Sequence, residues 1–321
     1  ARLAACASSK KVVFFEGDGT VAGEFTSGES GLVGLCGPHD LGLIFTATGD
    51  RVFCLSPDGG IIWQQSLAVS SLSCGSGGDF LAVARPGGSF TILSGSGKMV
   101  YEGKVSGDIL VSHVSDREMM VAFGTSREII CLTLGGFRED RFATSGSPTF
   151  VSCLAGGDVV WAVPDGVFKW RPESPDPQRL LRLSTPACCG AAAGNLVAIG
   201  TSGRDFFLLS PGQAALKVPV KSVPTAAAVS ADGQWAAVGT RYRVCTLVPF
   251  ERQRKPSYIK IKGRMEAVAL DRTAGRAAFL VGSEVILCAT GLISGAMGSA
   301  DPGKCDIDGT SRLFEGELEF L

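Results

Sequence analysis

Residues Leu41–Leu67 read LGLIFTATGDRVFCLSPDGGIIWQQSL, and this stretch decides the fold class. LGLIFTA, RVFCLS and GIIWQQSL are short runs rich in β-branched and aromatic residues, which is typical of β-strands. The segments between them, Thr48–Asp50 and Pro57–Gly60, consist of residues that favour turns. The stretch therefore predicts three consecutive strands joined by tight turns, with no helix.

The same pattern repeats along the whole chain. The second residue of the RVFCLS-type run has counterparts 38 to 41 residues apart, at Val12, Val52, Phe90, Ile129, Val167, Phe206, Val244 and Val285. Each unit contains four short strand-like runs, and about 40 residues with four strands is the length of one propeller blade. We therefore predict an all-β fold, a β-propeller of four-stranded antiparallel blades. Eight blades are expected, with seven as the alternative if a unit at one end is partial.

The repeat suggests one large domain and a separate tail. We assign residues 1–294 to the propeller and residues 295–321 to a Gly-rich linker followed by an acidic and apolar tail. In the tail, Ser311–Leu321 alternates Leu and Phe with Glu like an edge strand, so it is a candidate closing strand. Gly295–Ser299, GAMGS, resembles the residue scar of a removed expression tag, which makes a fused partner peptide the other interpretation.

The cysteine pattern argues against a disulfide framework. The chain has 11 cysteines, and most recur at equivalent positions of successive units: Cys36, Cys74, Cys153 and Cys189 in one strand, Cys54, Cys131, Cys245 and Cys288 in another. Such recurrence indicates small buried packing residues. The odd total and the lack of a secretory signal favour an intracellular setting, cytoplasmic or nuclear. A removed leader stays open because the chain begins at Ala1. No apolar run approaches the length of a membrane span.

Three segments resemble known propeller repeats. Ile44–Trp63, IFTATGDRVFCLSPDGGIIW, resembles a quinoprotein-type repeat, and Ala226–Pro249, AAAVSADGQWAAVGTRYRVCTLVP, is similar to a WD40 blade. Val151–Trp170, VSCLAGGDVVWAVPDGVFKW, is similar to tectonin-type repeats. The Gly-His and Trp-Asp dipeptides typical of WD40 repeats are absent from the sequence. The resemblance implies a scaffold, and a fold alone does not assign a chemistry.

No pattern in the sequence predicts a catalytic or metal site. The two histidines, His39 and His113, belong to different units, and the Asp-rich turns lack most oxygen ligands of a calcium loop. The vicinal pair Cys188-Cys189 makes a quinone-dependent redox enzyme a remote alternative. The quinoprotein-type dehydrogenases carry a vicinal disulfide beside the cofactor. Those enzymes are larger and richer in Trp than this chain, which has 4. We predict a protein that is not an enzyme and has no cofactor.

The net charge of −1 conceals an uneven distribution of charged residues. In a four-stranded antiparallel blade the first and third turns lie at one end and the second turn at the other. The second turns carry Lys10, Lys11, Arg51, Arg85, Arg127, Arg204, Arg241 and Arg243, with Tyr242 among them. Only the fifth and eighth sequence repeats lack a basic residue in this turn. The first and third turns carry mostly Asp and Glu. We expect the first-turn Asp residues to bond their own turns.

The second-turn residues Arg51, Arg85, Arg127, Arg204, Arg241, Tyr242 and Arg243 are the predicted partner-binding set. Arg residues repeated around one end of the propeller would bind carboxylates or phosphates. We predict an interaction scaffold in a multiprotein complex that binds an acidic, partly apolar peptide, and Leu313–Leu321 is a candidate peptide within the chain itself. Nucleic acid is the alternative partner for the same face, although a near-neutral chain offers less cationic surface than nucleic acid usually requires.

Overall fold

The structure, a computed structural model, describes residues 3–7, 10–16, 20–28, 30–38, 42–210, 212–242, 244–250, 256–261, 263–270, 276–281, 284–289 and 318–320. The chain divides into two compact units, which we call unit 1 (residues 1–180) and unit 2 (residues 181–320). In the described ranges the regular elements are β-strands, apart from one 3-10 turn, η2 (Pro86–Gly88). The all-β prediction is therefore confirmed.

Unit 1 contains five antiparallel sheets, the last of which ends with β19 just past the unit boundary. The first two sheets consist of β1 (Leu3–Ala7), β2 (Lys11–Phe15) and β3 (Val21–Thr26), then β4 (Leu32–Cys36), β5 (Ile44–Thr48), β6 (Arg51–Leu55) and β7 (Ile61–Ser66). The next three consist of β8 (Ser71–Cys74), β9 (Phe80–Ala84), β10 (Ser89–Ser94) and β11 (Met99–Lys104), then β12 (Ile109–Ser115), β13 (Met120–Thr125), β14 (Glu128–Thr133) and β15 (Arg138–Ala143), then β16 (Phe150–Cys153), β17 (Val159–Val163), β18 (Gly166–Trp170) and β19 (Gln178–Arg182).

Unit 2 contains three further sheets of the same kind. They consist of β20 (Ala187–Ala193), β21 (Leu196–Thr201), β22 (Asp205–Leu209) and β23 (Leu216–Pro219), then β24 (Pro224–Val229), β25 (Trp235–Thr240), β26 (Val244–Pro249) and β27 (Ser257–Lys260), then β28 (Met265–Leu270), β29 (Arg276–Val281) and β30 (Glu284–Ala289). Of the predicted tail, the structure describes only the short strand β31 (Leu318–Phe320). The remainder of residues 295–321 lies outside the described residues, so both interpretations of the tail, and the domain boundary at residue 294, stay predictions.

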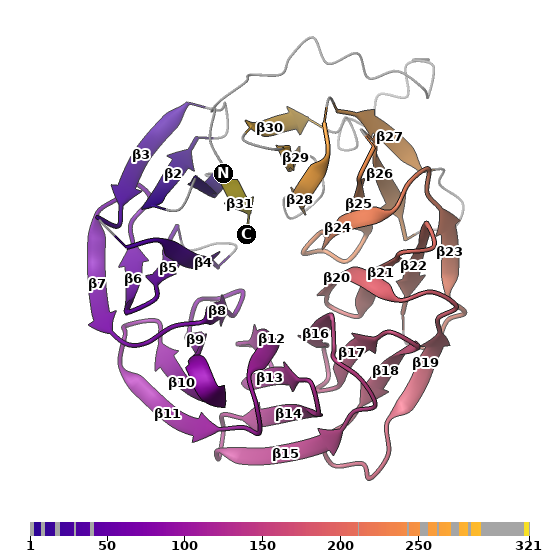
Figure 1. The fold of residues 1–321 in the computed structure, drawn as a ribbon, viewed down its shortest axis with the longest axis horizontal. Helices are drawn as coiled ribbons and strands as arrows, with labels where there is room; N and C mark the ends of the chain where they lie inside the picture. Colours follow the sequence, from indigo (N-terminus) through magenta and orange to yellow (C-terminus); the bar gives the residue numbers. More distant parts are fainter. Residues whose placement is uncertain are drawn as a thin grey trace. The chain divides into compact units, whose positions relative to one another are not determined.

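Among β1 to β30, the strands of a sheet pair in the order in which they follow one another in the chain. In Figure 1 the first strand of a sheet, such as β8 or β20, lies on the inner side of its unit's curve, and the fourth strand, such as β11 or β23, on the outer side. This order places the second turn of each sheet at the end opposite to the first and third turns. Eight such sheets confirm the prediction of eight blades in preference to seven.

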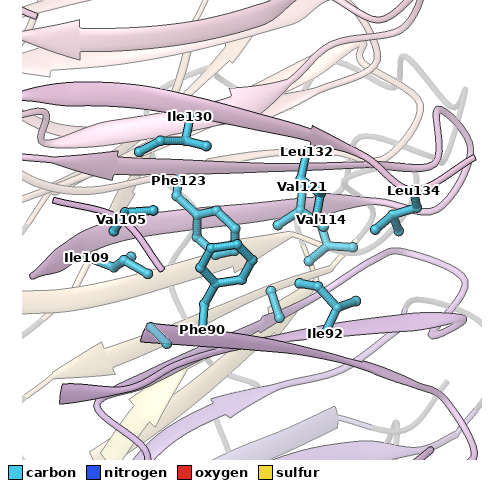
Figure 2. Close-up of a cluster of buried hydrophobic side chains, with 12 residues drawn as sticks. Phe90, Ile92, Val105, Ile109, Val114, Val121, Phe123, Ile130, Leu132 and Leu134 are labelled. Carbon is cyan, nitrogen blue, oxygen red and sulfur yellow. The ribbon is translucent and has the colours of Figure 1, made fainter. Parts of the chain in front are cut away.

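The hydrophobic core lies between successive sheets, because the middle strands are covered on both faces. β13 is buried along its whole length, whereas the outer strand β15 alternates between exposed and partly buried positions. Between the third and fourth sheets, the rings of Phe90 and Phe123 lie with centroids 4.5 Å apart. Figure 2 shows these two rings facing each other, with Ile92 and Val121 beside them. Similar clusters join the other neighbouring sheets within each unit.

The first strand of five sheets carries a β-bulge close to its start. In β12, Ile109 pairs with Thr125 and Val111 pairs with Gly124, so the residue between them has no opposite partner. The residues at this bulge position are Val33, Leu110, Cys188, Thr225 and Glu266. All except Thr225 are exposed. Since a first strand starts beside the end of the second strand, the bulges lie near the second-turn end of each sheet.

Candidate interaction surface

A buried threonine at the end of the second strand holds the second turn in four sheets. The hydroxyl of Thr125 donates to the carbonyl of Glu128 at 3.4 Å, and that of Thr240 donates to the carbonyl of Val244 at 2.8 Å. Thr48 and Thr201 make the same contact, with Arg51 at 3.5 Å and Asp205 at 3.4 Å. A side-chain bond of this kind closes the turn locally. Each threonine thereby positions the turn that carries the predicted arginines.

In unit 1 the three predicted arginines differ in their partners. Arg85 forms an ion pair with Glu102 of β11. Arg51 lies 3.8 Å, Nε to Oδ2, from its neighbour Asp50. Arg127 is exposed and forms no ion pair with the described residues. A fourth-strand carboxylate, Glu102, therefore neutralises part of the charge that the turn sequences alone suggest.

In unit 2 the predicted residues Arg204, Arg241 and Tyr242 are all exposed, and Tyr242 is 69% exposed. Arg204 occupies the left-handed region with φ of 67°, which is rare for a residue other than Gly. Its carbonyl accepts a hydrogen bond from the N–H of Val220 at 3.1 Å, which places the end of β23 against the turn. Arg243 lies outside the described residues.

The second-turn end of unit 2 also carries cations that the turn sequences did not reveal. The loops after fourth strands lie beside the second turns because β23 pairs with β22 and β27 pairs with β26. We define the unit 2 basic end as the five exposed residues Arg204, Lys221, Arg241, Lys260 and Arg264. Within the described part of the chain, none of the five forms an ion pair. The sequence signal for the three missed cations is a Lys or Arg at the end of a fourth strand or just after it.

The opposite end carries the expected carboxylates, with one correction to their role. Asp232 bonds its own turn, since its carboxylate accepts from the N–H of Gln234 at 2.9 Å. Asp116 instead accepts from the N–H groups of Gly77 at 2.7 Å and Phe80 at 3.1 Å, in the preceding sheet. Burial is the main reason that the pKa of Asp116 is raised. The expectation that every first-turn Asp bonds its own turn is wrong for the carboxylate of Asp116, because the packing of neighbouring sheets brings the N–H groups of Gly77 and Phe80 within hydrogen-bond distance of it.

The histidines and acidic groups give no sign of a metal site. The imidazole of His113 is partly buried and accepts from the backbone of Cys153, while His39 lies outside the described residues. The described residues contain no cluster of three or more His, Cys, Asp or Glu that could hold a metal ion. In the same ranges, no helix has the length and hydropathy needed to cross a bilayer.

Comparison with solved structures identifies the arrangement of these sheets. The structure of U3-55K superimposes with a TM-score of 0.64 at 12% identity, over 87% of this chain and 93% of that one. The crystal structure of the RRP9 WD40 repeats gives a TM-score of 0.65 at 12% identity, over 98% of this chain and 97% of that one. The chain has the WD40 β-propeller fold. The crystal structure of Saccharomyces cerevisiae Sqt1 agrees, with a TM-score of 0.65 at 14% identity over 81% of this chain and 83% of that one.

The WD40 fold assignment confirms the propeller resemblance noted in the sequence. No family model and no curated protein sequence matches the chain. Identities this low establish the fold and no function.

Proposed function

We propose that the protein is a non-catalytic interaction scaffold, placed inside the cell, that binds an acidic and partly apolar peptide segment of a partner protein. The second-turn ends of the sheets would hold the peptide. In unit 2 the contacts would come from Arg204, Arg241, Tyr242 and Arg243 with their neighbouring lysines. In unit 1, Arg51, Arg85 and Arg127 form a separate candidate set at the second-turn ends of that unit's own sheets. The assignment rests on the position of these residues at one end of each sheet, on the charge of the arginines, and on the exposure of Arg51, Arg127, Arg204, Arg241 and Tyr242. Arg243 is included on its place in the sequence alone.

The observation that carries the proposal is the unit 2 basic end. Its five cations are exposed and form no ion pair with described residues, whereas Lys217 nearby is paired with Asp205 at 2.9 Å. Arginine forks bind carboxylates in pairs of parallel hydrogen bonds, and lysines add positive potential. An uncompensated group of this kind favours an anionic partner.

Exposed apolar and aromatic groups support the apolar part of the partner. In unit 2, Tyr242 is 69% exposed and Tyr258 is 45% exposed, and the Lys221 ammonium lies 5.6 Å from the Tyr258 ring centroid. In unit 1 the bulge residues Val33 and Leu110 are exposed at the same end of their sheets as the second-turn arginines. Large exposed apolar side chains next to cations suit a peptide that alternates acidic and apolar residues.

A direct binding measurement tests this function. A labelled peptide with the sequence of Leu313–Leu321, LFEGELEFL, is titrated with the full chain, and a second peptide has its three Glu replaced by Gln. We expect the acidic peptide to bind more tightly. The double variant Arg204→Glu with Arg241→Glu should lose about tenfold or more in affinity, equivalent to about 1.4 kcal/mol.

The matched control reverses a cation at the opposite end. Arg117 has a side chain that is 82% exposed in the first turn of its sheet, so Arg117→Glu should leave the affinity unchanged. All variants should unfold at nearly the wild-type temperature, since the replaced groups are exposed. An affinity that is unaltered in the double variant would remove the proposal.

Nucleic acid is the second candidate, because unpaired cations beside exposed Tyr are also what single strands bind. The discriminating measurement is the salt dependence of binding for a single-stranded oligonucleotide and for the acidic peptide. An oligonucleotide that binds more tightly than the peptide, with log affinity falling steeply and linearly with log salt, would replace the peptide proposal.

A further inference from the structure

Two adjacent thiols in β20 are brought together by a break in the strand. Neighbouring residues of a regular strand point to opposite faces of a sheet. In β20, however, Ala187 pairs with Thr201 and Cys189 pairs with Gly200, so Cys188 is the extra residue of a β-bulge. Both sulfur atoms lie beside Gly200: the Cys188 thiol is 3.4 Å from its carbonyl oxygen, and a Cβ atom added to Gly200 would lie 2.6 Å from the Cys189 Sγ atom. The bulge thus directs two adjacent thiols toward the same two residues, Gly200 and Pro224.

The two thiols have different surroundings. Cys188 is exposed, and its thiol donates to the carbonyl oxygens of Pro224 at 3.2 Å and Gly200 at 3.4 Å. Cys189 is partly buried and packs against Gly200. A Cβ atom added to Gly200 would lie 2.6 Å from the Cys189 Sγ atom. The hydrogen bond from Cys189 lowers the pKa of Cys188, while the same bond and burial raise the pKa of Cys189 well above its usual value. Cys188 is therefore the accessible thiol that ionises first.

The other described cysteines have surroundings that suppress reaction. Cys36 and Cys74 also form a thiol pair, between the first strands of neighbouring sheets, but burial raises the pKa of Cys36 well above its usual value. Burial also raises the pKa of Cys54 to about 11 and that of Cys131 to about 12. Of the eight described cysteines, which are all free thiols, Cys188 is the one classed as exposed.

We propose that Cys188 and Cys189 form a redox-sensitive dithiol, which a low-molecular-weight disulfide such as oxidised glutathione converts to an intramolecular disulfide. Cys188 is the attacking thiol and Cys189 is the resolving thiol. The Cα atoms of adjacent residues are about 3.8 Å apart, less than the 4.4–6.8 Å of ordinary disulfides, so the ring is strained and easily reduced again. Such reversibility is typical of a regulatory disulfide. The inference does not depend on the proposed function.

The reaction consists of two exchange steps. The Cys188 thiolate attacks one sulfur of the small disulfide, whose S–S bond breaks, and a mixed disulfide forms as one small thiolate leaves. Cys189 then attacks the Cys188 sulfur, the ring disulfide forms, and the second small thiolate leaves. The two protons of the protein thiols go to the two leaving thiolates. In sum, two cysteine thiols are oxidised and one small disulfide is reduced to two thiols.

The test uses the full chain, oxidised glutathione and intact mass measurement followed by peptide mapping. We expect wild-type protein to lose two thiols, to retain no glutathione, and to return to the dithiol with mild reductant. Cys188→Ser should slow the reaction of this region more than about tenfold. Cys189→Ala should react at Cys188 and retain one glutathione as a stable mixed disulfide.

Two comparisons keep the proposal falsifiable if a Cys189 variant folds poorly. In wild-type protein, limited iodoacetamide should label Cys188 before Cys36 or Cys74, because those thiols are less exposed. Labelling of the Cys36 and Cys74 pair at the rate of Cys188 would overturn the assignment of the attacking thiol. Stable glutathione on Cys188 in wild-type protein would overturn the role of Cys189.

Discussion

The Nδ1 atom of His113 accepts a hydrogen bond from the backbone N–H of Cys153 at 3.2 Å. This bond joins β12 to β16, the first strands of two neighbouring sheets in unit 1. A protonated imidazole has no lone pair at Nδ1, so the contact requires neutral histidine. Burial lowers the pKa of His113 from 6.5 to about 4, which is consistent with this state. One of the two histidines in the sequence is therefore a structural acceptor.

We expect acid to weaken the fold through His113. Below the unfolded pKa of 6.5 the unfolded chain binds a proton that the folded chain binds only near pH 4, so stability falls as the pH falls through this window. The loss attributable to His113 should reach about 3 kcal/mol. Urea unfolding between pH 7 and pH 5 should show about 2 kcal/mol of this loss, and measurements continued to about pH 3.5 should show the rest. His113→Gln should show a smaller pH dependence, and His39→Gln should keep that of wild type; equal slopes in all three proteins would contradict the assignment.

Gly200 should not tolerate a side chain. An added Cβ atom would lie 2.5 Å from the Pro224 Cβ atom and 2.6 Å from the Cys189 Sγ atom, closer than van der Waals contact allows. Gly200→Ala should lower the free energy of unfolding by about 1–3 kcal/mol through overpacking. Gly135→Ala is the matched control, since an added Cβ there meets nothing within 4 Å. Similar denaturation midpoints for the two variants would mean that the sheets of unit 2 are less tightly packed than described.

Arg204 should separate stability from binding. Its φ of 67° is unfavourable for Arg and free of strain for Gly. Arg204→Gly should raise the free energy of unfolding by up to about 1 kcal/mol, while Arg241→Gly, at a residue without positive φ, should lower it by a similar amount. Thermal unfolding measures this difference. Both variants should weaken binding of the acidic peptide, and a loss of binding that simply followed stability would argue against a direct contact.

Several features were predictable because they depend on local sequence. The regular spacing of the anchor residues predicted eight four-stranded units, and eight sheets are found. The second-turn arginines could be assigned to one end of their sheets because antiparallel order determines which turns lie together. Arg204 and Arg241 are exposed there. What the turns alone could not show is that Glu102 of the fourth strand pairs with Arg85.

The amino-acid sequence by itself determined the number of sheets, the order of strands and the end of the sheet at which each turn lies. The alternation of side chains along a strand and the residue preferences of turns both depend on only a few neighbouring positions. Only the tertiary structure decided which cations remain unpaired, that Asp116 bonds the turn of another sheet, and that Cys188 lies in a bulge with its thiol on the Pro224 carbonyl. These outcomes depend on contacts between residues far apart in the chain, or on a bulge in the ladder, and neither is encoded by local periodicity.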